Sequence, residues 1–187
     1  MRLHHYKYYI FIDEFNKTIK KNLTKLSKPN LILNFKINNN SSLTLAQNII
    51  KFCKFNQIPF YTINDVKTAK KLNAHGIFIS SNNRKIGLSP CVNPKFKLIG
   101  SAHNQLEYFF KLRQNCQTLM LSPIFYNNKY SLNKILSPVK FNLISLNWKT
   151  DVCALGGISN NNIKKLKITK VKSIGIKSWI NKEIYQK

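Results

Sequence analysis

Short apolar segments of strand length alternate along the chain with longer polar segments, and this alternation predicts the fold. Eight apolar segments recur, at Tyr8–Asp13, Asn30–Ile37, Pro59–Ile63, Gly76–Ser80, Phe96–Ala102, Thr118–Ile124, Val152–Gly157 and Ser173–Trp179. Several of them, such as Ile77–Ile79 and Leu119–Leu121, are apolar at consecutive positions. This pattern is typical of parallel strands that are buried on both faces.

Polar segments between the strands carry apolar residues at helical spacing. They predict helices over Leu43–Phe52, Val66–Asn73 and Asn104–Asn115. Eight strands alternating with helices favour an α/β fold of the closed (β/α)₈ type, a TIM barrel.

The barrel must be short, because 187 residues is few for this fold. We expect trimmed helices: Ser81–Pro94 is predicted to be a loop, and only eight residues follow Trp179, so the last helix is stunted or missing. We expect a single domain over residues 1–187.

Two asparagine-rich loops precede predicted helices. The loop Asn38–Ser42 is expected to end in a helix N-cap at Ser41 or Ser42, and Asn160–Asn162 is expected to cap a short helix in the same way.

The charge is strongly positive, with 31 Lys and Arg against 6 Asp and Glu and a net charge of +25. Such a charge attracts polyanions. However, only three of the cations are Arg, and the chain is rich in Lys, Asn and Ile, whose codons are rich in A and T. Codon bias can therefore produce much of the charge. No nucleic-acid recognition motif is present, so a nucleic-acid-binding protein is the least favoured hypothesis.

Several classes of protein are disfavoured by what the chain lacks. No apolar run approaches the ~20 residues of a membrane span, and the first residues do not predict a signal peptide. Cys53, Cys91, Cys116 and Cys153 are scattered without a CxxC pair, which indicates reduced thiols and a cytoplasmic location. A zinc site assembled from these distant cysteines stays open as an alternative.

The active site of a TIM barrel lies where the strands end, and phosphate is often bound after strands seven and eight. Strand seven ends with Gly156 and Gly157, followed by a helix whose N–H groups could face an anion. Strand eight ends with Gly175, Lys177 and Ser178. These residues predict a phosphate site, although glycines at such positions also serve tight turns.

Other strand ends carry groups that could bind a substrate or a metal. Asp65 follows strand three and suits either a Mg²⁺ site or a helix N-cap. After strand five, Ser101 and His103 could face the pocket, although a lone histidine is more often structural, while Asn104 and Glu107 resemble a cap pair.

The strand-six end begins with Ser122 and Pro123, a rigid start to a loop. Lys129 follows in that loop. It could bind phosphate or be one of many surface lysines.

The ordered set of strand ends is more specific than any one of them. The chain resembles the thiamine-phosphate synthase/TenI superfamily from about Tyr8 to Ser178. The residues that carry the resemblance are Ile63–Asp65 with Thr68 and Ala69, Ala74–Ile79, Ile99–Asn104 with Glu107, Leu121–Phe125 and Ala154–Ile158.

This resemblance implies a (β/α)₈ barrel and a transferase of thiamine biosynthesis. The synthase of this family joins hydroxymethylpyrimidine diphosphate to a thiazole phosphate and releases pyrophosphate, with Mg²⁺ as cofactor. The expected partners are therefore phosphorylated pyrimidine and thiazole molecules, and we also expect a homo-oligomer, because exposed barrel helices often pair.

The resemblance also implies roles for individual residues. Lys36, Ser101 and Lys129 are expected to be catalytic, at the leaving pyrophosphate, and Asp65 and Asn83 to hold the metal. Substrate and phosphate binding is expected of Asn64, Ser122, Gly156, Gly157, Gly175 and Ser178.

Two departures from the family pattern keep an alternative open. On strand two the family has Gln-x-Arg-x-Lys, whereas this chain reads Ile32–Lys36 and keeps only Lys36. The second metal carboxylate is replaced by the neutral Asn83. Ionic contacts of this kind supply much of the charge stabilisation. The alternative is a catalytically impaired barrel that binds a phosphorylated thiamine precursor. The TenI tautomerase branch has a histidine on the strand-six loop, where this chain has Pro123.

Overall fold

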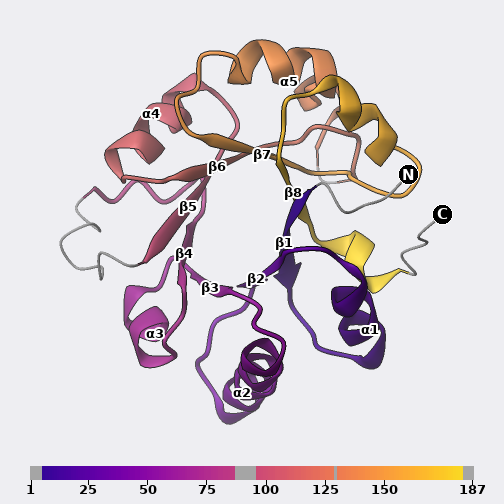
Figure 1. Cartoon of the computed structure of the whole chain (residues 1–187). Coiled ribbons are helices and arrows are strands. Elements are labelled where there is room, and N and C mark those ends of the chain that lie inside the picture. The colour runs from indigo at the N-terminus through magenta and orange to yellow at the C-terminus, as the bar shows by residue number, and fades with distance from the viewer. Residues whose placement is uncertain (1–5, 87–95, 129, 183–187) are drawn as a thin grey trace.

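Eight parallel strands close into one barrel in the order β1 to β8 (Figure 1). This computed structural model describes residues 6–86, 96–128 and 130–182. The strands are β1 Lys7–Ile12, β2 Pro29–Leu33, β3 Phe60–Ile63, β4 Gly76–Ile79, β5 Lys97–Ala102, β6 Thr118–Leu121, β7 Asp151–Leu155 and β8 Ser173–Ile176. Each strand pairs with its neighbours in sequence, and β8 closes the barrel on β1. The predicted (β/α)₈ barrel is confirmed.

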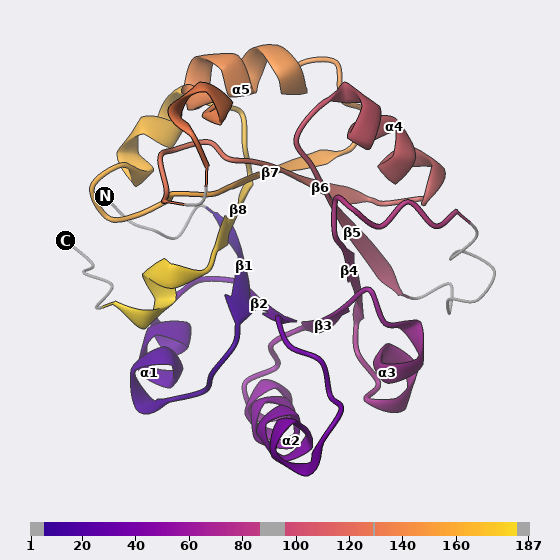
Figure 2. The ribbon, with the colours of Figure 1, turned by 180° about the vertical axis from the view of Figure 1, so that it is seen from behind.

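Helices surround the barrel on its outside (Figure 2). They are α1 Lys17–Lys25, α2 Asn40–Phe55, α3 Val66–Lys71, α4 Gln105–Arg113 and α5 Ser137–Ser145, with short 3₁₀ helices η2 Leu132–Lys134, η3 Ile163–Ile168 and η4 Ser178–Asn181. Residues 81–86 form neither helix nor strand, as expected, and the rest of the predicted loop, residues 87–94, lies outside the described residues. Only η4 follows β8 within the described residues, which agrees with the expected short last helix.

Some strands end earlier than the apolar pattern predicts. β2 was expected to reach Ile37 but ends at Leu33, which is paired with Ile12, the last residue of β1. β8 was expected to reach Trp179 but ends at Ile176, which is paired with Ile10. A strand lasts only while neighbouring backbones pair with it, so Lys36 lies in the loop after β2 and Ser178 begins η4, both beyond the barrel wall.

The prediction of the α2 cap at Ser41 or Ser42 was wrong by a few residues. Asn39 is the N-cap, and its Oδ1 accepts a hydrogen bond from the Ser42 N–H at 2.8 Å. The Ser42 hydroxyl accepts in return from the Asn39 N–H at 3.2 Å. This reciprocal pair satisfies two free donors of the first turn. Asn162 does not cap η3 through its side chain, which bonds Ser159 N–H at 2.9 Å and the Gly157 carbonyl at 2.7 Å.

The interior of the barrel is filled by one side-chain cluster, which we call the interior layer. Its members are Tyr9, Phe11, Ile32, Tyr61, Phe78, Ile99, Met120 and Cys153. The Phe11 and Phe78 rings meet edge to face with centroids 5.0 Å apart, and those of Tyr9 and Tyr61 lie 6.2 Å apart. The layer separates the carboxyl end of the barrel, where the strands finish, from the amino end, where they begin.

Cysteines of the described chain are free and buried. Burial raises the pKa of the Cys53, Cys116 and Cys153 thiols to about 12 each. Cys153 belongs to the interior layer, whereas Cys53 and Cys116 pack between strands and helices. Cys91 lies outside the described residues. Among those described, no three His, Cys, Asp or Glu side chains gather as a metal site, so nothing supports the zinc alternative.

No helix in the described part of the chain combines the length and the apolar character that crossing a membrane requires.

Candidate active site

A ring of polar residues lies at the carboxyl end of the barrel. Side chains alternate in direction along a strand, so a residue two positions beyond a member of the interior layer faces the barrel axis again. At the carboxyl end these residues are Asp13, Asn34, Ser80, Ser101 and Ser122, which follow Phe11, Ile32, Phe78, Ile99 and Met120. The sequence of the strands therefore places an apolar floor beneath a polar mouth, which suits a polar substrate.

One part of this ring joins the ends of β1, β2 and β8. The Asp13 carboxylate accepts a hydrogen bond from the Asn34 amide and forms an ion pair with Lys177, with Oδ2 and Nζ 2.8 Å apart. Lys177 was a candidate for the phosphate site, and it is paired with a carboxylate instead. Sequence analysis missed Asp13 and Asn34, although Asp13 directly follows an apolar strand in the same way as Asp65.

A second network joins the ends of β3 and β4. Asn64 has a left-handed backbone, with φ of 53°, which asparagine tolerates well. Its amide donates to the Ser80 hydroxyl at 2.9 Å, and its Oδ1 accepts from Ser80 N–H at 3.0 Å and from the Asn83 amide at 3.1 Å. The structure thus brings together two predicted site residues, Asn64 and Asn83, through Ser80.

Asp65 caps helix α3, as one of its two interpretations predicted. Its Oδ1 accepts from Thr68 N–H at 2.9 Å and its Oδ2 from the Thr68 hydroxyl at 2.6 Å. Partial burial acts to raise the pKa of Asp65, but the hydrogen bonds from Thr68 and from the Lys67 backbone outweigh it, so the pKa lies below its ordinary value. The carboxylate is exposed and ionised at neutral pH. A role in metal binding stays a prediction.

The loop after β4 is held from below by Lys111 of α4. This lysine is fully buried, and its Nζ donates to the carbonyls of Ser80 and Asn83 at 2.7 Å each and to Gln114 Oε1 at 2.9 Å. Gln114 in turn donates to the carbonyls of Asn83 and Lys85. Burial lowers the pKa of Lys111, and Cys116 and Glu107 partly offset this. Lys111 and Gln114 thereby fix the loop that carries Asn83.

Sequence analysis missed Lys111. The helical spacing of the sequence could have predicted its burial. Lys111 lies three residues from both Tyr108 and Gln114, and all three are on the buried side of α4.

His103, at the end of β5, is oriented by Glu107. The His103 Nδ1 lies 2.9 Å from Glu107 Oε2, which also accepts from the His103 backbone N–H at 2.7 Å. The His103 Nε2 lies 3.3 Å from the Tyr130 hydroxyl. Asn104 caps α4 by accepting from Glu107 N–H at 2.9 Å, which confirms the predicted cap pair. A histidine held between a carboxylate and a phenol can exchange protons. Tyr130 was missed by sequence analysis.

The glycines after β7 are required by packing. Gly156 and Gly157 have φ of 96° and 69°, and the Phe125 N–H donates to the Gly156 carbonyl at 3.1 Å. A Cβ on Gly157 would lie 2.4 Å from the Tyr126 carbonyl oxygen. Close approach of the loop after β6 therefore accounts for these glycines, and their binding of phosphate stays a prediction. The helix expected next is the six-residue 3₁₀ helix η3, which begins at Ile163 and does not present its first turn at Gly157.

The remaining predicted residues are spread around the same end. Ser101 and Ser122 are buried at the mouth, with 7% and 5% of their surfaces exposed, whereas Lys36 is exposed in the loop after β2 and Ser178 is exposed at the start of η4. Gly175 lies within β8 in the barrel wall rather than after the strand end, and it leaves room for Leu155, 2.7 Å from where a Cβ would be. Lys129 lies outside the described residues.

The comparisons with known proteins agree with this geometry. The family described as thiamine monophosphate synthase, TMP-TENI, matches residues 19–180. The chain belongs to this family. The resemblance predicted from the strand ends is thereby confirmed.

Relatives in the thiamine monophosphate synthase family are moderately similar. A thiamine-phosphate synthase from Flavobacterium psychrophilum is 27% identical over 73% of this chain and 70% of its own length. One from Staphylococcus haemolyticus is 30% identical over 65% of this chain and 58% of its own length. A solved structure, the thiamine phosphate pyrophosphorylase from Pyrococcus furiosus, superposes with a TM-score of 0.75 at 15% identity, over 94% of this chain and 87% of that one. That superposition shows a shared fold.

Proposed function

We propose that this protein joins hydroxymethylpyrimidine diphosphate to a thiazole phosphate and releases pyrophosphate, giving thiamine phosphate. Membership of the thiamine monophosphate synthase family supports a role in thiamine biosynthesis. The observation that carries the proposal is the polar ring at the carboxyl end of the barrel, which includes the family residues Ser101 and Ser122 and lies above an apolar floor.

In the reaction, pyrophosphate departs from the pyrimidine and the thiazole nitrogen attacks the resulting carbocation. The site must therefore bind two anions and favour the departure of one. The hydroxyls of Ser101 and Ser122 can donate to phosphate oxygens at the mouth, and the exposed Lys36 attracts anions to it. The floor formed by Phe11 and Phe78 excludes water from below the carbocation.

The donors at the ends of β3 and β4 suit Mg²⁺ only with help from the substrate. Asp65 supplies one exposed carboxylate, and the Asn83 Oδ1 already accepts from Lys85 N–H at 3.1 Å, which leaves it one lone pair. Mg²⁺ commonly takes one or two protein ligands and completes its shell with water and substrate phosphates. We infer that Asp65 and Asn83 would hold the ion, which would neutralise charge on the leaving pyrophosphate.

A coupling assay tests the proposal directly. Both phosphorylated halves and Mg²⁺ are supplied, and thiamine phosphate is measured for the wild type, Asp65→Asn and Asp65→Ala. Asn caps helices about as well as Asp, so Asp65→Asn should keep the fold and still lower the rate by about a hundredfold through loss of the charge. Failure of the wild type to form thiamine phosphate would sink the synthase proposal. Full activity in Asp65→Asn would remove Asp65 from the metal site.

Asn83→Asp sharpens the metal assignment. It restores a second carboxylate, so the Mg²⁺ concentration needed for half-maximal rate should fall. An unchanged Mg²⁺ dependence would remove Asn83 from the set of ligands.

The other expectations stay proposals of lower rank. The impaired barrel would bind the phosphorylated precursors but give no product in the same assay. A nucleic-acid function would require duplex binding that persists at physiological salt.

We propose a cytoplasmic location from the free thiols. A homo-oligomer is supported by exposed apolar side chains on α4 and α5, such as Phe109 and Leu143.

A further inference from the structure

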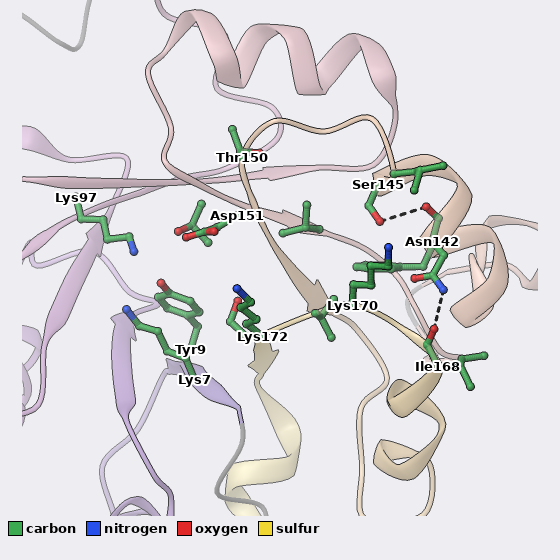
Figure 3. Close-up of a pocket in the computed structure, with 16 residues that line it drawn as sticks. Lys7, Tyr9, Lys97, Asn142, Ser145, Thr150, Asp151, Ile168, Lys170 and Lys172 are labelled. Carbon is green, nitrogen blue, oxygen red and sulfur yellow. Dashed lines mark hydrogen bonds between the residues drawn. The ribbon is translucent and has the colours of Figure 1, made fainter.

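A cavity of about 520 Å³ opens at the amino end of the barrel, on the opposite side of the interior layer from the candidate active site (Figure 3). The first residues of β1, β5, β6, β7 and β8 contribute to it, namely Lys7, Lys97, Thr118, Asp151 and Ser173. Its outer wall is largely apolar and includes Phe141, Leu146 and Ile168. This volume is within the range of small-molecule sites.

Cations converge on one side of this cavity. The side chains of Lys7, Lys97 and Lys172 point toward one another and toward the Tyr9 hydroxyl, while Lys170 lies against the far wall (Figure 3). Asp151 is the one acidic residue of the lining. Within the described residues it forms no ion pair with any of these lysines. The cavity therefore holds an excess of positive charge that the protein does not neutralise.

The convergence of lysines changes the pKa of Lys7. Burial lowers the pKa of its ammonium group, the neighbouring Lys97 lowers it further, and Asp151 and Cys153 only partly oppose them. The Lys7 Nζ lies 5.4 Å from the centre of the Tyr9 ring, which is a weak attraction. Folding thus brings like charges together in a partly buried place, which is unfavourable unless an anion joins them.

Two hydroxyls in the same lining lack partners. The Oγ1 atoms of Thr118 and Thr150 are buried and have no hydrogen-bond partner among the described residues. Thr118, which is 2% exposed, lies near the Tyr9 hydroxyl but forms no hydrogen bond of acceptable geometry with it. Buried polar groups are nearly always paired. The Thr118 hydroxyl has the Tyr9 hydroxyl beside it, so Thr150 is the hydroxyl of this lining that indicates a missing partner.

We propose that this cavity is a second ligand site, which binds an organic phosphate. The phosphate oxygens accept from Lys7, Lys97 and Lys172, and a ring system packs on Phe141 and Leu146. Asp151 accepts an N–H from the ring, which explains a carboxylate in an otherwise cationic cavity. The site is independent of the coupling reaction, because the interior layer lies between them.

Calorimetric titration with three probes tests the ligand class. AMP carries phosphate, ring and amino group, inorganic phosphate carries the anion alone, and adenosine carries the ring alone. We expect AMP to bind more tightly than inorganic phosphate and adenosine to bind least. Binding of inorganic phosphate as tight as that of AMP would show that the site takes the free anion and would overturn the proposal of an organic ligand. Absence of AMP binding would overturn the site.

Matched variants locate the binding. Lys7→Gln combined with Lys97→Gln should weaken AMP by about tenfold or more. The control pair Lys51→Gln and Lys54→Gln removes two exposed lysines from α2 and should leave AMP binding unchanged. Bound AMP should also protect Lys7 and Lys97 from acetylation, measured by mass spectrometry. Equal AMP affinity in both double variants would place the phosphate elsewhere, including the candidate active site.

Two stability readouts remain informative if a variant folds poorly. Without ligand, the Lys7→Gln/Lys97→Gln protein should unfold at no lower temperature than the wild type, since a repulsion has been removed, and AMP should no longer raise that temperature. Asp151→Asn removes the one carboxylate of the lining and should strengthen inorganic phosphate binding. Weaker phosphate binding in Asp151→Asn would contradict the proposal.

Discussion

The two ends of this barrel differ in whether their buried or partly buried lysines have acceptors. At the carboxyl end, Asp13 is paired with Lys177, and the buried Lys111 has three acceptors. At the amino end, Lys7 and Lys97 approach one another around a cavity whose one carboxylate, Asp151, forms no ion pair with them among the described residues. Both ends are rich in lysine because the whole chain is. The difference lies in the acceptors that the fold provides.

This difference teaches how to sort lysines in a strongly basic chain. A lysine whose donors are all used, such as Lys111, has a structural role that holds a loop in place. A lysine that faces another lysine in a recess, such as Lys7, stores unfavourable energy that a ligand can release. Net charge alone cannot separate these cases.

The largest expected effect is at the packed glycine of the carboxyl end. Gly157→Ala places a Cβ against the Tyr126 and Phe125 carbonyls at a positive φ, so we expect about 3 kcal/mol of lost stability in urea unfolding. Ser159→Ala, two residues later, is the control and should stay near the wild type. A loss below about 1 kcal/mol would show that the loop after β6 yields easily.

Lys111→Met tests whether the carboxyl end depends on its satisfied cation. The Ser80 carbonyl and Gln114 Oε1 lose their donor, so stability should fall by about 2 kcal/mol. Coupling activity should fall by about a hundredfold, because the loop carrying Asn83 moves. Arg113→Met removes an exposed cation from the same helix as a control. Equal stability and activity in the two variants would end the distinction between the lysines.

The pH dependence of stability examines the amino end. The pKa of Lys7 is lower in the folded protein than its ordinary value of 10.5, so the unfolded chain binds more protons just below that value. Lys7 therefore adds a stabilising contribution that grows with pH in this alkaline range, whereas the buried thiols, whose pKa is raised to about 12, make stability fall there. Lys7→Met should make the pH slope of the free energy of unfolding more negative than it is in the wild type. Urea titrations between about pH 8 and pH 10 measure this, and an unchanged slope would contradict it.

The smallest effect is expected at the exposed ion pair. Lys177 and Asp13 are 43% and 48% exposed, so Lys177→Met should cost less than about 1 kcal/mol. High salt should abolish the difference. A larger, salt-insensitive loss would indicate that the pair holds β1, β2 and β8 together.

The apolar pattern predicted the fold better than the site. All eight strands were located, because each strand is apolar on both faces. Several of their ends, such as those of β2 and β8, were predicted too late, because a strand stops where pairing with its neighbour stops, as after the pair Leu33 and Ile12, even where the composition would continue it. The cap pair Asn104 and Glu107 was predictable because a cap depends on residues close in sequence.

Contacts between distant segments could not be predicted in this way. Lys177 meets Asp13 across 164 positions, and Lys111 meets Ser80 across 31. Asp65 was assigned two roles by its neighbours, and only the cap is visible in the structure. The cavity at the amino end was not foreseen at all, because the first residues of strands were not considered as a group.

The interior layer, with its rings Tyr9, Phe11, Tyr61 and Phe78, also lets the two ends of the barrel change independently in evolution. These uncharged rings lie between a lysine that is gained at one end and the residues of the other end, so the new charge has little effect there. Substitutions at the amino end can therefore accumulate without being selected through the reaction at the carboxyl end. A barrel with such a filled centre can keep an inherited activity while it acquires an unrelated ligand on its opposite side.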